Sequence, residues 1–159
     1  MENTAFVYTS YIRATPEQLW KALIDPALTS RYWGTSFETD WAAGSPMVWT
    51  ERGVRTIDPE QVVLEATPCK RLSYTWHTFT PEWAELAGVS EEVRATLAEE
   101  PRSKVTFEIE PVGKTVKLTL IHDFGSADTL RGMCGKAWPG LVCSLKTLME
   151  TGETLSFTA

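Results

Sequence analysis

The sequence predicts an α+β fold in which a curved antiparallel sheet of six or seven strands wraps around a long C-terminal helix. From Leu130 to Leu148, apolar side chains recur at spacings of three and four, as in a helix with one buried face. Most of the preceding chain consists of short stretches in which apolar and polar residues alternate, which is typical of half-buried strands. A terminal helix of this kind has to pack on the sheet, and such an arrangement commonly encloses a ligand pocket.

The first strand and two short helices are predicted at the N-terminus. Residues 5–13 are rich in β-branched and aromatic side chains, which favour a strand. Thr15-Pro16-Glu17-Gln18 has the features of a helix start: an N-cap threonine, a proline at the first helical position and a glutamine that can complete a capping box. Asp25-Pro26 ends this helix and begins a second one, which runs to Trp33 and is closed by Gly34.

The middle of the chain predicts an antiparallel meander. The alternation is clearest in Arg71–His77, where Leu72, Tyr74 and Trp76 share one face. Because alternate residues face opposite ways, His77 is expected to point away from that face. The expected strands are 36–40, 47–51, 54–66 with an interruption at 58–59, 71–77, 105–109 and 116–120, with 111–114 as the last hairpin turn.

An acidic segment, residues 80–102, interrupts the meander and is expected to be helical. It is rich in glutamate and lies between Pro81 and Pro101, and Ser90 can cap a helix in which Val93 and Leu97 are four apart. Two interpretations stay open: a lid over the mouth of a pocket, or a solvated excursion between two strands.

Composition limits the classes of partner. The net charge of −6, with no basic patch, disfavours nucleic acids and anionic membranes. No apolar stretch is long enough to span a bilayer and no leader precedes the first strand, so we expect a cytoplasmic protein.

Cys69, Cys134 and Cys143 lack metal-ligand spacing and are expected to be reduced thiols, with no metal and no cofactor. No linker or repeat divides the chain, so residues 1–159 are expected to form a single domain.

The chain resembles the START-like (SRPBCC) superfamily, which includes birch-pollen allergens and polyketide cyclases. Within it, the chain is most similar to the family named after the C-terminal domain of the activator of the Hsp90 ATPase. The motifs that carry the resemblance are Ala14–Leu23, Asp25-Pro26 with Arg31–Gly34, Asp40-Trp41 with Gly44, and Trp138–Leu141 ahead of Leu145-Lys146. The resemblance implies a helix-grip fold, and it says little about reacting groups because fold and function separate easily.

The function that we expect is binding of a small hydrophobic or aromatic molecule between the sheet and the terminal helix, rather than catalysis. Inward-facing strand residues and the terminal helix supply the expected walls. These residues are Phe37, Trp49, Glu51, Tyr74, Trp76, Phe107, Leu118, His122, Met133, Trp138 and Leu141.

Two alternatives accompany this interpretation. One is an enzyme of the cyclase or aromatase kind in which Glu51 or His122 moves a proton, although both are weak candidates. A histidine on an apolar face is more often a satisfied core residue, and Glu51 is expected to pair with Arg55 or His122. The other is a protein-interaction module of the co-chaperone kind, with its partner unidentified; a homodimer also stays open.

Trp138-Pro139-Gly140 lies inside the terminal amphipathic pattern and predicts an irregularity there. A proline within a helix removes one hydrogen bond and clashes with the preceding turn. We therefore expect a kink or break at this triplet, or a main helix that begins only at Pro139.

Overall fold

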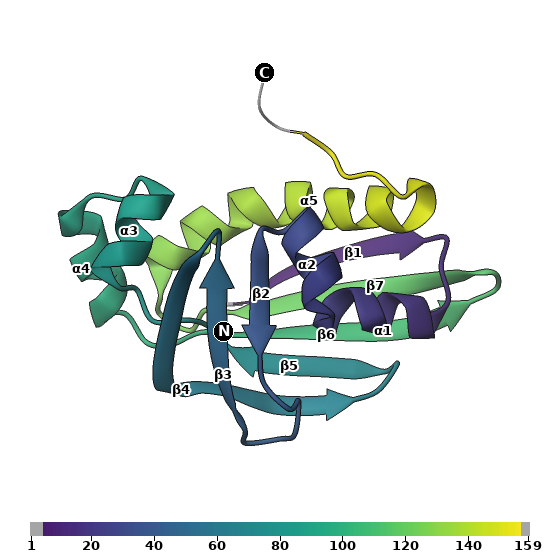
Figure 1. The fold of residues 1–159 in the computed structure, drawn as a ribbon, viewed down its shortest axis with the longest axis horizontal. Helices are drawn as coiled ribbons and strands as arrows, with labels where there is room; N and C mark the ends of the chain where they lie inside the picture. The colour runs from purple at the N-terminus through teal and green to yellow at the C-terminus, as the bar shows by residue number, and fades with distance from the viewer. Residues whose placement is uncertain (1–4, 157–159) are drawn as a thin grey trace.

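The structure, a computed structural model, describes residues 5–156 and contains seven strands and five helices in that range (Figure 1). Residues 1–4 and 157–159 of the expected domain lie outside the described residues. The elements are β1 (Ala5–Ile12), α1 (Pro16–Ile24), α2 (Pro26–Tyr32), β2 (Thr35–Glu38), β3 (Pro46–Glu51), β4 (Val54–Thr67), β5 (Arg71–Thr75), α3 (Pro81–Ala87), α4 (Glu91–Glu99), β6 (Lys104–Val112), β7 (Thr115–Asp123) and α5 (Asp128–Thr151).

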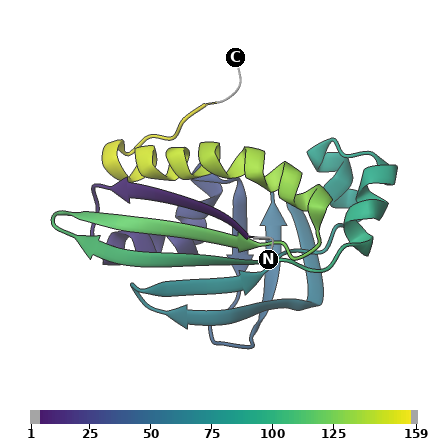
Figure 2. The ribbon, with the colours of Figure 1, turned by 180° about the vertical axis from the view of Figure 1, so that it is seen from behind.

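The strands form one antiparallel sheet in the order β1-β7-β6-β5-β4-β3-β2. The sheet is curved, and α5 lies lengthwise along it beside β1 (Figure 2). The core lies between them, where buried residues of the sheet such as Tyr74, Phe107 and Leu118 belong to one cluster with Trp138 and Leu145 of α5. The α+β helix-grip fold is therefore confirmed, including the two short helices after the first strand.

The predicted start of α1 forms as a complete capping box. The Thr15 Oγ1 accepts a hydrogen bond from the Gln18 amide at 3.1 Å, and the Gln18 Oε1 accepts one from the Thr15 amide at 2.9 Å. Asp25 then ends α1 and caps α2 through its carboxylate. These caps fix the direction of α2 and so place Trp33, which follows it, over the sheet.

Several strands differ in extent from the sequence prediction. Strand β5 ends at Thr75, two residues early, because the next residues turn toward α3. The last hairpin turn contains only Gly113 and Lys114, and Pro111 belongs to β6. A proline is tolerated there because the pairing of β5 with β6 ends at Glu108, so no neighbour on that side needs its N–H. Strand β4 is continuous, with a register shift against β3 near the expected interruption.

Helix α5 runs through Pro139 without a break, so a helix that begins at Pro139 is wrong. Pro139 has no N–H to donate to the Gly135 carbonyl, and burial of Leu130, Cys134 and Trp138 on the same helix offsets this loss. Cys143 lies on the exposed side of α5. No helix within the described range is long and apolar enough to cross a membrane.

Thr15→Ala is expected to lower the free energy of unfolding by about 1 kcal/mol, because one orphan amide of α1 loses its partner. Thr15→Ser retains a hydroxyl at the cap and should stay within about 0.5 kcal/mol of the parent chain. Urea unfolding followed by circular dichroism measures both variants. Equal losses in the two variants would show that the cap hydroxyl contributes nothing.

Candidate functional site

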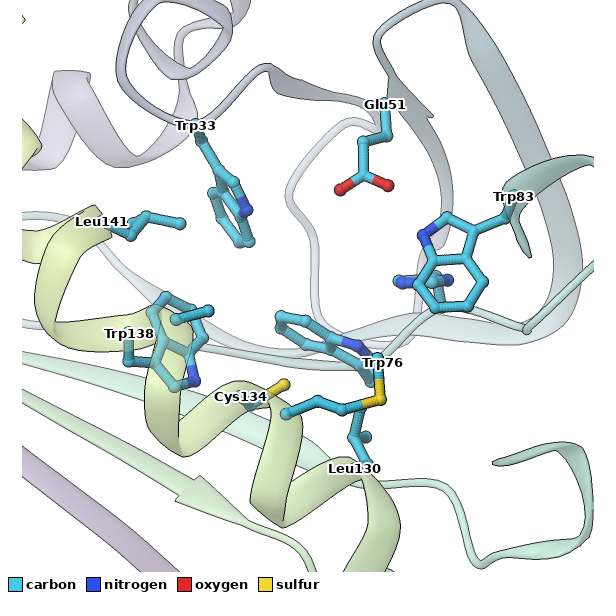
Figure 3. A pocket seen from close by; sticks show the side chains of 11 residues that line it. Trp33, Glu51, Trp76, Trp83, Leu130, Cys134, Trp138 and Leu141 are labelled. Atoms are coloured by element: carbon cyan, nitrogen blue, oxygen red, sulfur yellow. The ribbon is translucent and has the colours of Figure 1, made fainter. Parts of the chain in front are cut away.

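A cavity of about 190 Å³ lies beside the N-terminal half of α5, where the ends of β3 and β5 meet the helices α2 and α3 (Figure 3). Most of its wall is apolar and aromatic, and its polar groups are few. The lining residues are Trp33, Glu51, Trp76, His77, Trp83, Leu130, Met133, Cys134, Ala137, Trp138 and Leu141.

Three tryptophans from different elements form a continuous aromatic wall. Trp33 follows α2, Trp76 follows β5 and Trp138 belongs to α5. Their ring centroids lie 5.5 Å apart for Trp33 and Trp138, 6.1 Å for Trp33 and Trp76, and 5.7 Å for Trp76 and Trp138. Aromatic rings at these separations attract one another, so the wall is held in place before any ligand arrives.

Trp138 is anchored behind this wall by a buried histidine. Its Nε1–H donates to the Nδ1 of His122 at 3.0 Å, so His122 carries its proton on Nε2 and donates it to the Ser103 Oγ at 2.8 Å. Burial lowers the pKa of His122 to about 3, which keeps the ring neutral at neutral pH. His122 is fully buried and does not line the cavity, so it cannot exchange a proton with a ligand there.

His77 takes the place at the cavity that the sequence assigned to His122. Because β5 ends at Thr75, strand alternation no longer applies, and both Trp76 and His77 line the cavity. The Nδ1–H of His77 donates to the Thr78 carbonyl at 2.9 Å, and burial lowers the pKa of His77 to about 4. Its Nε2 is therefore an unprotonated acceptor, with no hydrogen-bond partner among residues 5–156.

Glu51, at the end of β3, points its carboxylate into the cavity (Figure 3). Neither expected partner reaches it: Arg55 pairs with Glu38 at 3.0 Å, and His122 bonds to Ser103 and Trp138. The carboxylate thus has no cationic partner in the described part of the chain. Together with burial, which is the larger cause, its charge raises the pKa of the Cys134 thiol to about 12, so Cys134 is an uncharged wall residue.

A family model described as activator of Hsp90 ATPase homolog 1-like protein matches residues 13–150. The chain belongs to this family. No match was found among curated protein sequences. Similar solved structures include protein MLL2253 from Mesorhizobium loti, which is 24% identical, with 91% of this chain and 95% of that chain covered and a TM-score of 0.68. Another is the Aha1 dimer from Colwellia psychrerythraea, which is 19% identical, with 93% of this chain and 97% of that chain covered and a TM-score of 0.65. CalU16 from Micromonospora echinospora is 17% identical, with 95% of this chain and 76% of that chain covered and a TM-score of 0.64. At these identities the likeness shows the fold alone.

The acidic segment forms two helices, α3 and α4, which lie near the N-terminal end of α5 (Figure 1). Thr80 caps α3, and Trp83 on that helix contributes the fourth tryptophan of the wall. After α4, the Glu100 carboxylate accepts hydrogen bonds from the backbone amides of Thr129 and Leu130 at 2.9 and 3.2 Å. Glu100 thereby caps α5, whose own N-cap residue makes no side-chain bond, and ties the segment to the helix.

The structure brings some of the expected site residues to the cavity and leaves others in the core. Those at the cavity are Glu51, Trp76, Met133, Trp138 and Leu141. The others point inward as expected, but neighbouring rings such as Trp33 cover them, so no open space remains beside them. These core residues are Phe37, Trp49, Tyr74, Phe107, Leu118 and His122.

Several lining residues were not among those expected: Trp33, His77, Trp83, Leu130, Cys134 and Ala137. Some of them carried a signal. Leu130, Cys134 and Ala137 precede Trp138 and Leu141 on the same apolar stripe, so the helix pattern already placed them on that face. Trp83 had only its size, as a large apolar residue within an acidic segment.

Stability is expected to fall as the pH drops from about 6.5 to about 4, because both histidines are neutral when folded. The histidines of the unfolded chain take up protons below about pH 6.5, whereas those of the folded chain do not. Each histidine therefore lowers the free energy of unfolding by up to about 1.4 kcal/mol for each pH unit. Urea unfolding at several pH values measures this slope. His77→Gln should make it shallower.

Glu150→Gln is the matched control for that slope. The pKa of Glu150 lies below its ordinary value, chiefly because Lys146 bonds to it, so this carboxylate stays ionised above about pH 5 in both the folded and the unfolded chain. The variant should keep the parent slope between about pH 5 and 6.5. A parent-like slope in His77→Gln would contradict the assignment of a neutral His77.

Proposed function

We propose that this protein binds a small apolar or aromatic molecule in the tryptophan-lined cavity. The observation that carries the proposal is the cavity of about 190 Å³ with four tryptophans among its lining residues. A cavity of roughly 150 Å³ is enough to hold a benzene ring, so this one suits a molecule of about one ring with a short substituent. Membership of the family is compatible with this role and does not specify it.

The physical basis of binding is the burial of apolar surface in a site that is already formed. Trp76 and Trp138 are themselves buried and lie against the core cluster, so little side-chain freedom is left to lose when a ligand enters. Apolar burial contributes about 25 cal/mol for each Å² removed from water. The ligand would enter past Ala137, the one exposed lining residue of α5, between the half-buried Met133 and Leu141.

Catalysis of the cyclase or aromatase kind is the second candidate, and the position of Glu51 at the cavity favours it. The full burial of His122 argues against the histidine that the sequence suggested. Neutral His77 lies at the same cavity and is the more suitable acceptor of a proton. A pH profile of turnover that shifts in Glu51→Gln would support the enzyme.

The free thiols of Cys69, Cys134 and Cys143 support a reducing compartment. We therefore propose that binding takes place in the cytoplasm.

Ala137→Phe is expected to weaken binding of 2-phenylethanol by about tenfold or more, because the new ring occupies the cavity that the ligand needs. Isothermal titration calorimetry measures the affinity. Cys143→Phe adds the same ring to an exposed position of α5 outside the cavity and should bind as the parent does. Equal affinity in the two variants would place binding elsewhere.

The acidic segment is expected to act as a lid, because Trp83 of α3 contributes to the wall opposite α5. Ligand binding should then slow amide hydrogen exchange in α3 and α4, and leave the β6–β7 hairpin unchanged. Exchange measured by mass spectrometry with and without 2-phenylethanol tests this expectation. Equal exchange in the segment under both conditions would identify it as a solvated excursion.

A further inference from the structure

The polar groups of the cavity indicate which apolar molecules it prefers. We propose that the cavity selects a small organic cation, an ammonium ion carried on a single-ring apolar body, with Glu51 as its counter-ion. This inference rests on the proposed function, because it concerns the same cavity. It adds the charge of the ligand, which neither the family nor the fold specifies.

The first reason is an uncompensated negative charge. Glu51 is the one acidic residue of the lining, and no lysine or arginine is among the residues there. Arg55 on the neighbouring strand pairs with Glu38. Arg102, whose charge reaches His77, is occupied by Asp58 at 3.6 Å and by the Trp76 carbonyl at 2.7 Å. A neutral ligand would displace the water that solvates this carboxylate and offer no charge to compensate, and an anion would be repelled by it.

The second reason is the aromatic wall. Trp33, Trp76 and Trp138 lie side by side, and Trp83 faces them from α3. The face of an indole ring carries partial negative charge and attracts cations more strongly than other aromatic side chains do. Tryptophan faces beside a carboxylate are the chemistry by which proteins recognise organic ammonium ions.

The third reason is that the cavity contains hydrogen-bond acceptors without donors. Glu51 and the Nε2 of His77 both accept hydrogen bonds and have no donor among residues 5–156, whereas an ammonium group offers donors. The indole N–H of Trp83 is a donor, which an ammonium group cannot satisfy, and it lies on the side that faces the Glu51 carboxylate (Figure 3). The ammonium end of the ligand therefore belongs between Glu51 and His77, and its ring belongs against Trp33 and Trp138.

The test compares 2-phenylethylammonium with 2-phenylethanol, which have nearly the same shape and differ in charge. Isothermal titration calorimetry near neutral pH, where the amine is protonated, measures both affinities. We expect the ammonium ion to bind about tenfold more tightly than the alcohol. Glu51→Gln should remove that preference and leave the affinity for the alcohol within about twofold.

Glu110→Gln is the matched control, because it removes the same charge from an exposed position of β6 outside the cavity. It should keep the parent preference for the ammonium ion. An equal fall in both variants would assign the preference to the net charge of the chain and overturn the site. Circular dichroism confirms that the variants are folded, and the comparison of the two ligands on the parent chain needs no variant.

The outcomes separate this inference from the proposed function. If the alcohol binds as tightly as the ammonium ion or more tightly, the cation preference is overturned and the apolar binding site stands. If neither compound binds the parent chain at millimolar concentration, both proposals are overturned. If the ammonium ion binds more tightly and the preference survives in Glu51→Gln, Glu51 is not the counter-ion.

Discussion

The hydrogen bond from the Trp138 indole to His122 is the constraint on which the site depends. It joins α5 to β7 inside the core, where water cannot compete, and it sets both the rotation and the position of the helix on the sheet. Once Trp138 is fixed, helical spacing places Cys134 and Leu130 in turn along the cavity. The Ser103 hydroxyl completes the bond network of His122, so the anchor leaves no ring nitrogen unsatisfied.

This anchor also explains how a proline is tolerated within α5. The helix is held by burial along its length and not by an unbroken ladder of hydrogen bonds, so the loss at Pro139 is local. At its N-terminal end the helix depends on Glu100, a residue of the acidic segment, for its cap. The acidic segment, which contributes Trp83 to the cavity, is therefore tied to the helix that forms the cavity floor, and a movement of one has to disturb the other.

The sequence was sufficient for the fold and only partly sufficient for the site. Capping residues such as Thr15, together with strand alternation, specify local structure, and these predictions hold. Alternation also states correctly that Phe37 and Tyr74 point inward. It cannot state which inward positions are covered, because that depends on the packing of Trp33, which lies outside the strands, between α2 and β2. His77 was missed because residues alternate between the two faces only within a strand, and β5 ends at Thr75.

The two histidines show how the same residue type serves the core at one position and the cavity at another. Both are buried and neutral, yet His122 has a partner for each nitrogen, whereas His77 lacks one for Nε2 within the described residues. The half-buried carboxylate of Glu51 and the buried indole N–H of Trp83 also lack partners within the described residues, and all three groups lie at one cavity. Leaving buried polar groups unpaired costs about 1 to 3 kcal/mol each, a cost that the fold avoids at His122. An ammonium ligand would supply donors to Glu51 and to the Nε2 of His77, the two acceptors that meet at this cavity.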